Sequence, residues 1–193
     1  MDCIKVGKLI LSLRKEKQLT QKQLATAINI SDKTVSKWER GLGCPDVSLL
    51  RALSEILGVD TAQLLAGCLD TNAADGGNMK RIKFYVCPNC GNIINSTADA
   101  EITCCGRKLE ALLAKPADET HHAIVQVVDN QHYITLSHEM SKAHFISFVA
   151  RVTSDRLVLV RLYPEQDAQL YLPIAFGDKI YFYCNRHGLW INS

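Results

Sequence analysis

Residues 20–41 read TQKQLATAINISDKTVSKWERG and decide the fold of the first third of the chain. Thr20 and Gln23 have the spacing of a capping box, in which each side chain satisfies a free backbone amide at a helix start. Ser31 is a favourable N-cap for a second helix over 32–40, where Val35 and Trp38 share one face. A helix, a short turn and a second capped helix predict a helix-turn-helix, the motif that places its second helix in the major groove of DNA.

Short helices are also expected on both sides of this stretch. Ile10 and Leu13 have helical spacing within 6–17, and a run of leucines and isoleucines follows Asp46 until Gly58. Thr61 is placed to cap a last helix. The sequence therefore predicts an all-α, five-helix domain over 1–66. Residues 67–79 are mostly small and polar and predict a flexible linker.

The positive charge of the chain is concentrated in this predicted domain. Residues 1–41 hold nine Lys and Arg against four Asp and Glu, whereas from Asp75 onward the count is twelve against twelve. A basic first third predicts that only the N-terminal part binds a polyanion. On the second helix, Lys33 or Lys37 can donate to guanine and Asp32 can accept from a cytosine amine. The alternative is a helical bundle whose basic face is only solvated.

The motif Thr20-Gln21-x-x-Leu24-Ala25, followed by Ser31-x-x-Thr34-Val35-Ser36-x-Trp38-Glu39-x-Gly41, resembles the Cro/lambda-repressor-type (XRE) helix-turn-helix family. The resemblance covers 4–66. It implies sequence-specific DNA binding through a set of residues on and before the second helix: Gln21, Ser31, Asp32, Lys33, Thr34, Lys37 and also Arg40. Because such units usually read paired half-sites, we also expect a homodimer.

The rest of the chain has a sequence pattern typical of strands rather than helices. The 193 residues are 47% hydrophobic and 22% charged, a globular composition. No run approaches the ~18 apolar residues of a membrane span, and the N-terminus lacks the apolar core of a secretory signal, so we expect a cytoplasmic protein with no membrane contact. Short β-branched and aromatic runs predict an antiparallel sandwich or barrel with strands at 123–128, 132–136, 144–152, 157–162, 180–183 and 189–191.

The eight cysteines are too few for a disulfide framework, and in a reducing compartment metal ligation is the favoured interpretation. Four of them, in a Cys-x-x-Cys-Gly knuckle and an adjacent pair, predict a tetrahedral site for iron or zinc: Cys87, Cys90, Cys104 and Cys105. The adjacent pair favours iron, because a d¹⁰ ion gains nothing from a distorted tetrahedron. We expect free thiols at the three without ligand spacing: Cys3, Cys44 and Cys68.

Tyr85-x-Cys87-x-x-Cys90-Gly91 with Cys104-Cys105-Gly106 resembles the desulforedoxin centre, a mononuclear iron tetrathiolate. The resemblance implies a small desulforedoxin-like Fe(Cys)₄ module over 80–115. A structural zinc in the same site is the alternative.

Histidines in the last third are grouped in a way that suggests a second metal site. His138-x₅-His144 and Cys184-x-x-His187 lie within one predicted β domain, and His121 and His122 precede its first strand. A single histidine is more often a structural polar residue, but two spaced motifs together indicate metal binding. His132 is expected to be structural or solvated.

Glu119-x-His121, His138-x-Met140-x-x-x-His144 and Cys184-Asn185-x-His187-Gly188-x-Trp190 resemble the active-site domain of superoxide reductase, also called desulfoferrodoxin or neelaredoxin. The resemblance implies an immunoglobulin-like β-sandwich over 116–193 and a catalytic Glu119. It implies an iron with an axial thiolate and four equatorial imidazoles: Cys184, His121, His138, His144 and His187. It also implies reduction of superoxide to hydrogen peroxide, with electrons from an external donor such as a rubredoxin-like protein.

Three positions depart from that family. Thr120 stands where the family has a lysine that attracts superoxide, and Glu139 and Ala123 stand where it has proline. Without the lysine, we expect substrate capture to slow by about tenfold. The sequence therefore predicts a superoxide reductase joined to a DNA-binding domain. The alternatives are a redox-sensing transcriptional regulator without efficient turnover, and a repressor with a zinc-stabilised β dimerisation module.

Overall fold

The computed structural model describes residues 1–72, 74 and 76–192, so positions 73 and 75 of the predicted linker and position 193 lie outside it. The chain divides into two compact units, Met1–Thr71 and a second unit that begins at Asn72. The finer division at 66, 79 and 115 stays a prediction. No helix in the described part of the chain has the length and apolar character that crossing a membrane requires.

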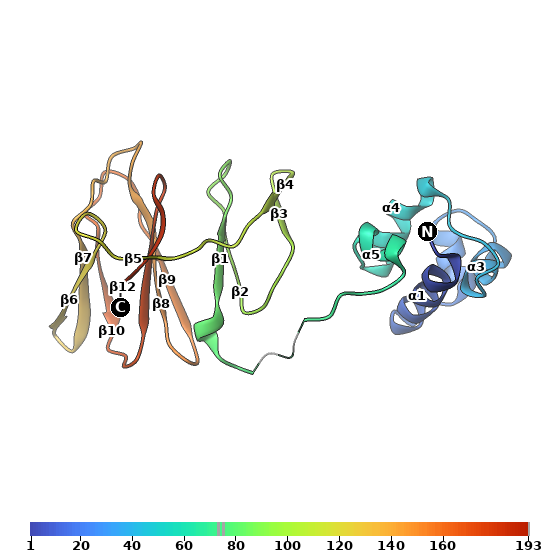
Figure 1. Cartoon of the computed structure of the whole chain (residues 1–193), viewed down its shortest axis with the longest axis horizontal. Helices are drawn as coiled ribbons and strands as arrows, with labels where there is room; N and C mark the ends of the chain where they lie inside the picture. Colours follow the sequence, from blue (N-terminus) through green and yellow to red (C-terminus); the bar gives the residue numbers. More distant parts are fainter. Residues whose placement is uncertain (73, 75, 193) are drawn as a thin grey trace. The chain divides into compact units, whose positions relative to one another are not determined.

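The five predicted helices make up the first unit: α1 (Cys3–Glu16), α2 (Gln21–Ala27), α3 (Asp32–Glu39), α4 (Val47–Leu57) and α5 (Thr61–Ala66) (Figure 1). The predicted caps of the helix-turn-helix are present: Thr20 and Gln23 form the capping box of α2, and the Ser31 side chain accepts the Thr34 amide at the start of α3. The prediction for α5 was wrong by one residue. Its N-cap is Asp60, whose carboxylate accepts the Ala62 amide, because a carboxylate satisfies that amide as well as a hydroxyl does.

Helices α1 and α3 cross at very short range. A Cβ at Gly7 would lie 1.9 Å from the carbonyl oxygen of Trp38, so only glycine fits there. The same two helices are joined by Arg14 and Glu39, which form a buried bidentate ion pair with N–O distances of 2.5 and 3.1 Å. Burial alone would raise the pKa of Glu39, but hydrogen bonds from Arg14 and Gln21 hold it below its ordinary value. The pair joins the last turn of α1 to the end of α3.

A disulfide joins Cys3 to Cys44, with a Cα–Cα distance of 4.9 Å. The prediction that both are free thiols was therefore wrong. The two residues are 41 positions apart, and they meet because α1 and the segment after α3 are packed together. Cys68 is a free, exposed thiol, as predicted.

The second unit begins with two small antiparallel hairpins. A 3₁₀ turn, η1 (Met79–Arg81), leads into β1 (Lys83–Val86), which pairs with β2 (Ile93–Ser96). The second hairpin pairs β3 (Ile102–Cys104) with β4 (Arg107–Leu109) through a turn in which Cys105 and Gly106 have positive φ angles of 50° and 73°. Each hairpin therefore holds two of the cysteines at one end.

Eight further strands form two sheets packed face to face. A five-stranded sheet has the order β5-β12-β11-β8-β9, and a three-stranded sheet has the order β10-β7-β6. Their bounds are β5 (Lys115–Pro116), β6 (Ala123–Val128), β7 (Gln131–Leu136), β8 (Ile146–Val152), β9 (Leu157–Arg161), β10 (Gln169–Pro173), β11 (Lys179–Cys184) and β12 (Gly188–Asn192). Side chains from both sheets share one buried cluster, which includes Ile134, Val149 and Phe182. The predicted antiparallel β-sandwich is thus present, with one parallel pair, β12 and β5.

Strand β8 is buried on both faces, and all seven of its residues are buried. Val149 faces the sandwich core, whereas Phe148 packs with Phe84 of β1 on the opposite face. The sequence predicted this strand from His144, but it begins at Ile146, and His144 forms only an isolated bridge with Ser141. The first hairpin and the sandwich therefore share a core, and His144 belongs to a loop.

Candidate metal centres and DNA-binding surface

Loops at one end of the sandwich carry the five residues of the first candidate centre. Cys184 ends β11, and the tight turn to β12 carries His187. His138 and His144 lie in the segment between β7 and β8, and His121 precedes β6. One ligand atom from each of the five lies within 4.8 Å of the others.

The four imidazoles form a closed ring of neighbours. Their centroids are 4.9 Å apart for His121 and His138, 4.5 Å for His138 and His144, 4.7 Å for His144 and His187, and 4.8 Å for His187 and His121. The Nδ1 atom of His187 is 2.9 Å from Nε2 of His121 and 3.2 Å from Nε2 of His144. Two ligands at right angles about an ion, each about 2.1 Å away, would be about 3.0 Å apart. The imidazoles therefore fit an equatorial ligand set.

Two further observations fit a metal at the centre of this ring. Nε2 of His138 is buried and has no hydrogen-bond partner among the described residues, which is unusual for a polar atom. The Cys184 thiol is fully buried and lies 3.5 Å from Nδ1 of His187. Burial lowers the pKa of His121 and of His138, so both are held in the neutral form that binds metals.

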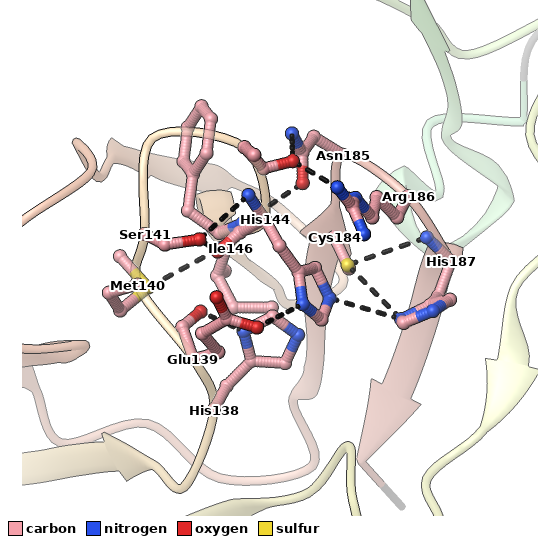
Figure 2. Close-up of polar contacts among 12 residues, drawn as sticks. His138, Glu139, Met140, Ser141, His144, Ile146, Cys184, Asn185, Arg186 and His187 are labelled. Carbon is pink, nitrogen blue, oxygen red and sulfur yellow. Dashed lines mark hydrogen bonds and ion pairs between the residues drawn. The ribbon is translucent and has the colours of Figure 1, made fainter.

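The outer nitrogens of three candidate ligands contact oxygens, which fixes the direction of the inner nitrogens. Nδ1 of His138 is 2.5 Å from the backbone carbonyl oxygen of Glu139. Nδ1 of His121 is 2.8 Å from the Thr120 hydroxyl and 3.4 Å from the Asp118 carboxylate. Nδ1 of His144 is 2.8 Å from the Glu139 carboxylate (Figure 2). Carboxylates and other oxygens in these positions orient metal-binding histidines and raise their basicity.

The two loops that carry the candidate ligands are tied to each other. Asn185 accepts the Phe145 amide at 2.9 Å and donates to the Ala143 carbonyl at 3.1 Å, and Arg186 donates to the same carbonyl (Figure 2). These bonds join the turn after Cys184 to the segment just before β8. The relative position of His144 and His187 is therefore set by direct hydrogen bonds rather than by sheet geometry alone.

An open cavity of about 490 Å³ lies over the imidazoles. It is lined by the four histidines and by Glu119, Thr120, Ser137 and Glu139. Among the described residues that line it there are two carboxylates and no Lys or Arg. Lys142, the sequence-based candidate to replace the missing lysine, pairs instead with Glu165 at 3.6 Å. A small molecule can reach the imidazoles, but the cavity offers it no lysine.

The second candidate centre is the cysteine group predicted from the sequence: Cys87, Cys90, Cys104 and Cys105. The sulfurs of Cys90 and Cys104 are 3.6 Å apart, close to the spacing of about 3.8 Å expected for sulfurs 2.3 Å from a tetrahedral ion. A hydrogen bond from the Cys90 amide lowers the pKa of Cys87 to about 6, whereas bonds with neighbouring thiols raise the pKa of Cys105 to about 12. A cation bound by these four sulfurs would stabilise all of them as thiolates.

The predicted DNA-binding residues lie at the start of α2 and on the exposed side of α3. Lys33 and Lys37 are exposed, whereas Val35 and Trp38 point into the core. Some of the other predicted residues already have partners within the unit. Ser31 is hydrogen-bonded to Thr34, and the Gln21 amide donates to Glu39 at 2.6 Å. Their contact with DNA stays a prediction.

These features define a class: a helix-turn-helix unit joined to a β protein with two candidate mononuclear metal centres. Comparisons with known proteins show what each part is similar to. Residues 10–64 match the helix-turn-helix family model. The C-terminal region is homologous to desulfoferrodoxin.

The homology of the second part rests on a desulfoferrodoxin of Syntrophotalea carbinolica, which is 26% identical over 120 residues, 58% of this chain and 95% of the relative. The superoxide reductase of Treponema pallidum shares the fold, with a TM-score of 0.51 and 20% identity over 58% of this chain and 98% of that one. For the first part, the HTH-type transcriptional activator BcrR of Enterococcus faecalis is 35% identical over 77 residues, 38% of each chain.

Sequence reasoning did not identify the residues that support the candidate ligands. Glu139 was noted only as a departure from proline, and Asp118 was not noted. Asp118 accepts the backbone amides of Thr120 and His121, a local turn that the order Asp-x-Thr-His could have suggested. Trp190, which stacks on His121 with centroids 4.3 Å apart, was seen only as part of the family motif.

Proposed function

We propose that this chain is a superoxide reductase that also binds DNA sequence-specifically. The observation that carries the proposal is the closed ring of four imidazoles beside a buried thiol, with an open cavity above them. Iron bound by His121, His138, His144, His187 and Cys184 would supply one-electron reduction of superoxide, and two protons would complete hydrogen peroxide.

The residues of the chain have distinct roles in this proposal. A metal held by the imidazoles would be accessible from the cavity that they line, and Cys184 would supply a buried thiolate, to whose sulfur the backbone N–H of His187 donates at 3.4 Å. Thr120 and Asp118 orient His121, and Glu139 orients His144. Glu119 lines the cavity, and we assign its carboxylate to proton delivery to the substrate.

We propose that Cys87, Cys90, Cys104 and Cys105 hold a second iron, which receives electrons from an external donor such as a rubredoxin-like protein. The spacing of the Cys90 and Cys104 sulfurs is compatible with either iron or zinc. Visible absorption of a ferric tetrathiolate supports iron, and a colourless zinc-loaded centre contradicts it.

For DNA binding, we propose contacts from Gln21, Ser31, Asp32, Lys33, Thr34 and Lys37 by a homodimer in the cytoplasm. A dimer supplies two copies of α3 for paired half-sites. Light scattering of the full chain tests the dimer, and a monomer at all concentrations contradicts it.

The decisive experiment for catalysis is anaerobic purification, metal analysis and pulsed generation of superoxide. We expect two irons per chain, a ferric–thiolate absorption band after oxidation, and one peroxide for each superoxide consumed. Zinc alone with no peroxide formed contradicts the proposal. Slow peroxide formation together with DNA binding that follows the iron oxidation state would instead favour a redox-sensing regulator, an alternative that the two carboxylates in the cavity motivate.

A further inference from the structure

The disulfide of the first unit is separate from both candidate metal centres. Cys3 and Cys44 are both half-buried, so a small oxidant or reductant can reach them. In the reducing compartment predicted from the sequence, disulfides are uncommon, and those that occur are mostly transient and redox-sensing. We propose that Cys3 and Cys44 form a peroxide-responsive thiol pair, and that their oxidation to the disulfide strengthens DNA binding by the helix-turn-helix unit.

The position of the pair links it to the helices that are predicted to contact DNA. Cys3 is the first residue of α1, and Cys44 lies between α3 and α4, five residues after Glu39. The disulfide closes a loop of the chain that contains α1, α2 and α3, and therefore every residue to which we assign a DNA contact. Oxidation at this one place thus constrains the whole predicted DNA-binding surface.

The segment that the disulfide constrains is glycine-rich. A Cβ at Gly41, which has a φ of +73°, would lie 2.9 Å from Cγ1 of Ile4, so this end of the segment is packed against α1. At Gly43, a Cβ would meet no atom of the described chain within 4 Å, so there is open space on that side of the backbone. The disulfide therefore adds a covalent constraint to the segment after α3 next to this open space.

Two physical effects give the direction of the change. A cross-link between residues 41 positions apart removes conformational freedom from the unfolded chain, which stabilises the folded unit. A preorganised α3 also loses less conformational freedom when it binds, which increases affinity. Both effects favour the oxidised form as the tighter DNA binder.

The chemical step is balanced with hydrogen peroxide as the oxidant. One thiolate attacks the peroxide O–O bond and forms a sulfenic acid, with release of hydroxide. The second thiol attacks that sulfur, the S–S bond forms, and water leaves. In total the two thiols lose two electrons and two protons, and the peroxide becomes two waters. Under the proposed function, the second unit produces this oxidant, but added peroxide serves equally well, so the inference does not depend on that activity.

The test uses the full chain, reduced with dithiothreitol and then treated with a small molar excess of hydrogen peroxide. Non-reducing peptide mapping by mass spectrometry locates the cross-link. Affinity is measured for a duplex selected by this protein from a random-sequence library. Cys3→Ser and Cys44→Ser remove the pair, and Cys68→Ser is the matched control because Cys68 is a free, exposed thiol of the same unit.

We expect peroxide to produce the Cys3–Cys44 cross-link and to tighten DNA binding by about tenfold. The Cys68→Ser variant should respond like the unmodified chain, whereas Cys3→Ser and Cys44→Ser should keep the affinity of the reduced chain under both conditions. Hydrogen exchange of peptides from α1 to α3 shows whether each variant is folded. Failure of the cross-link to form overturns the inference, as does equal DNA affinity of the reduced and cross-linked chains. If the unmodified chain does not reduce superoxide but still forms the cross-link and binds DNA more tightly after peroxide treatment, only the proposed function is contradicted.

Discussion

Replacing Glu139 by glutamine should raise the reduction potential of the iron that we propose for the His₄Cys site. The Glu139 carboxylate is 2.8 Å from Nδ1 of His144, whose Nε2 faces the centre of the ring. Hydrogen bonds from Ser141 and His144 hold the pKa of Glu139 below its ordinary value, so it is ionised at neutral pH. A carboxylate in this position makes the imidazole a stronger donor, which favours ferric over ferrous iron.

The size of the shift follows from the exposure of the pair. A charged acceptor makes a bond about twice as strong as a neutral one, but the Glu139 side chain is 59% exposed, so solvent reduces the difference. We expect about a threefold change in the ratio of ferric to ferrous stability, which corresponds to roughly 30 mV for one electron. The potential of Glu139→Gln should therefore be higher by about that amount.

The assay is an equilibrium redox titration of the thiolate absorption band under anaerobic conditions. Glu165→Gln is the matched control: it also removes one carboxylate, but its side chain pairs with Lys142 rather than with a candidate ligand. An unchanged or lower potential in Glu139→Gln, or an equal shift in the control, would refute the reasoning.

Three further predictions concern the cavity and the first unit. Thr120→Lys should increase the rate constant for the reaction with superoxide by about tenfold at low salt, and by less at high salt, as measured by pulse radiolysis. Thr120→Ala is the control, because it also removes the hydrogen bond to His121 but adds no charge. A rate constant of Thr120→Lys that does not depend on salt would contradict the prediction. Glu39→Gln should destabilise the helical unit by about 3 kcal/mol at pH 7, because Arg14 is then left buried without its ion pair. The folded-state pKa of Glu39 is lowered, so the unmodified chain should lose this stability as the pH falls below about 4.3. The stability of the variant, measured by hydrogen exchange, should not fall in this way. Parallel pH profiles of the two chains would contradict the prediction. Lys37→Ala should weaken DNA binding and reduce the slope of log affinity against log salt by about one, and an unchanged slope would show that Lys37 does not contact a phosphate.

Local signals in the sequence predicted much of the fold. The capping box of α2, the serine cap of α3 and the glycine that ends α4 act on backbone groups within four residues, so a short window contains all the information. The strands at Ala123–Val128 and Leu157–Arg161 were predicted to within a residue for the same reason. Strand β10 was missed, because Gln169–Pro173 is a short run that ends in proline, a residue that argues against a strand.

Spacing indicated the four cysteines of one candidate centre and two grouped motifs of the other, because chemistry restricts the residues that bind iron or zinc. The full set of four histidines and Cys184 came from the resemblance to the superoxide reductase family. Neither indicated how the ligands are supported. The contact between Glu139 and His144 depends on the loop between β7 and β8, and His144 itself was predicted to begin a strand. Only the structure shows that Lys142 pairs with Glu165 and that no lysine is among the described residues that line the cavity.

The amino-acid order by itself determined the helices, the metal-binding residue types and the division between a helical and a β-rich part. These properties depend on neighbours along the chain or on the chemistry of single side chains. Only the tertiary structure decided that Cys3 meets Cys44 and which charges surround the cavity, because these contacts join segments tens of residues apart, and their distances follow from packing rather than from sequence separation.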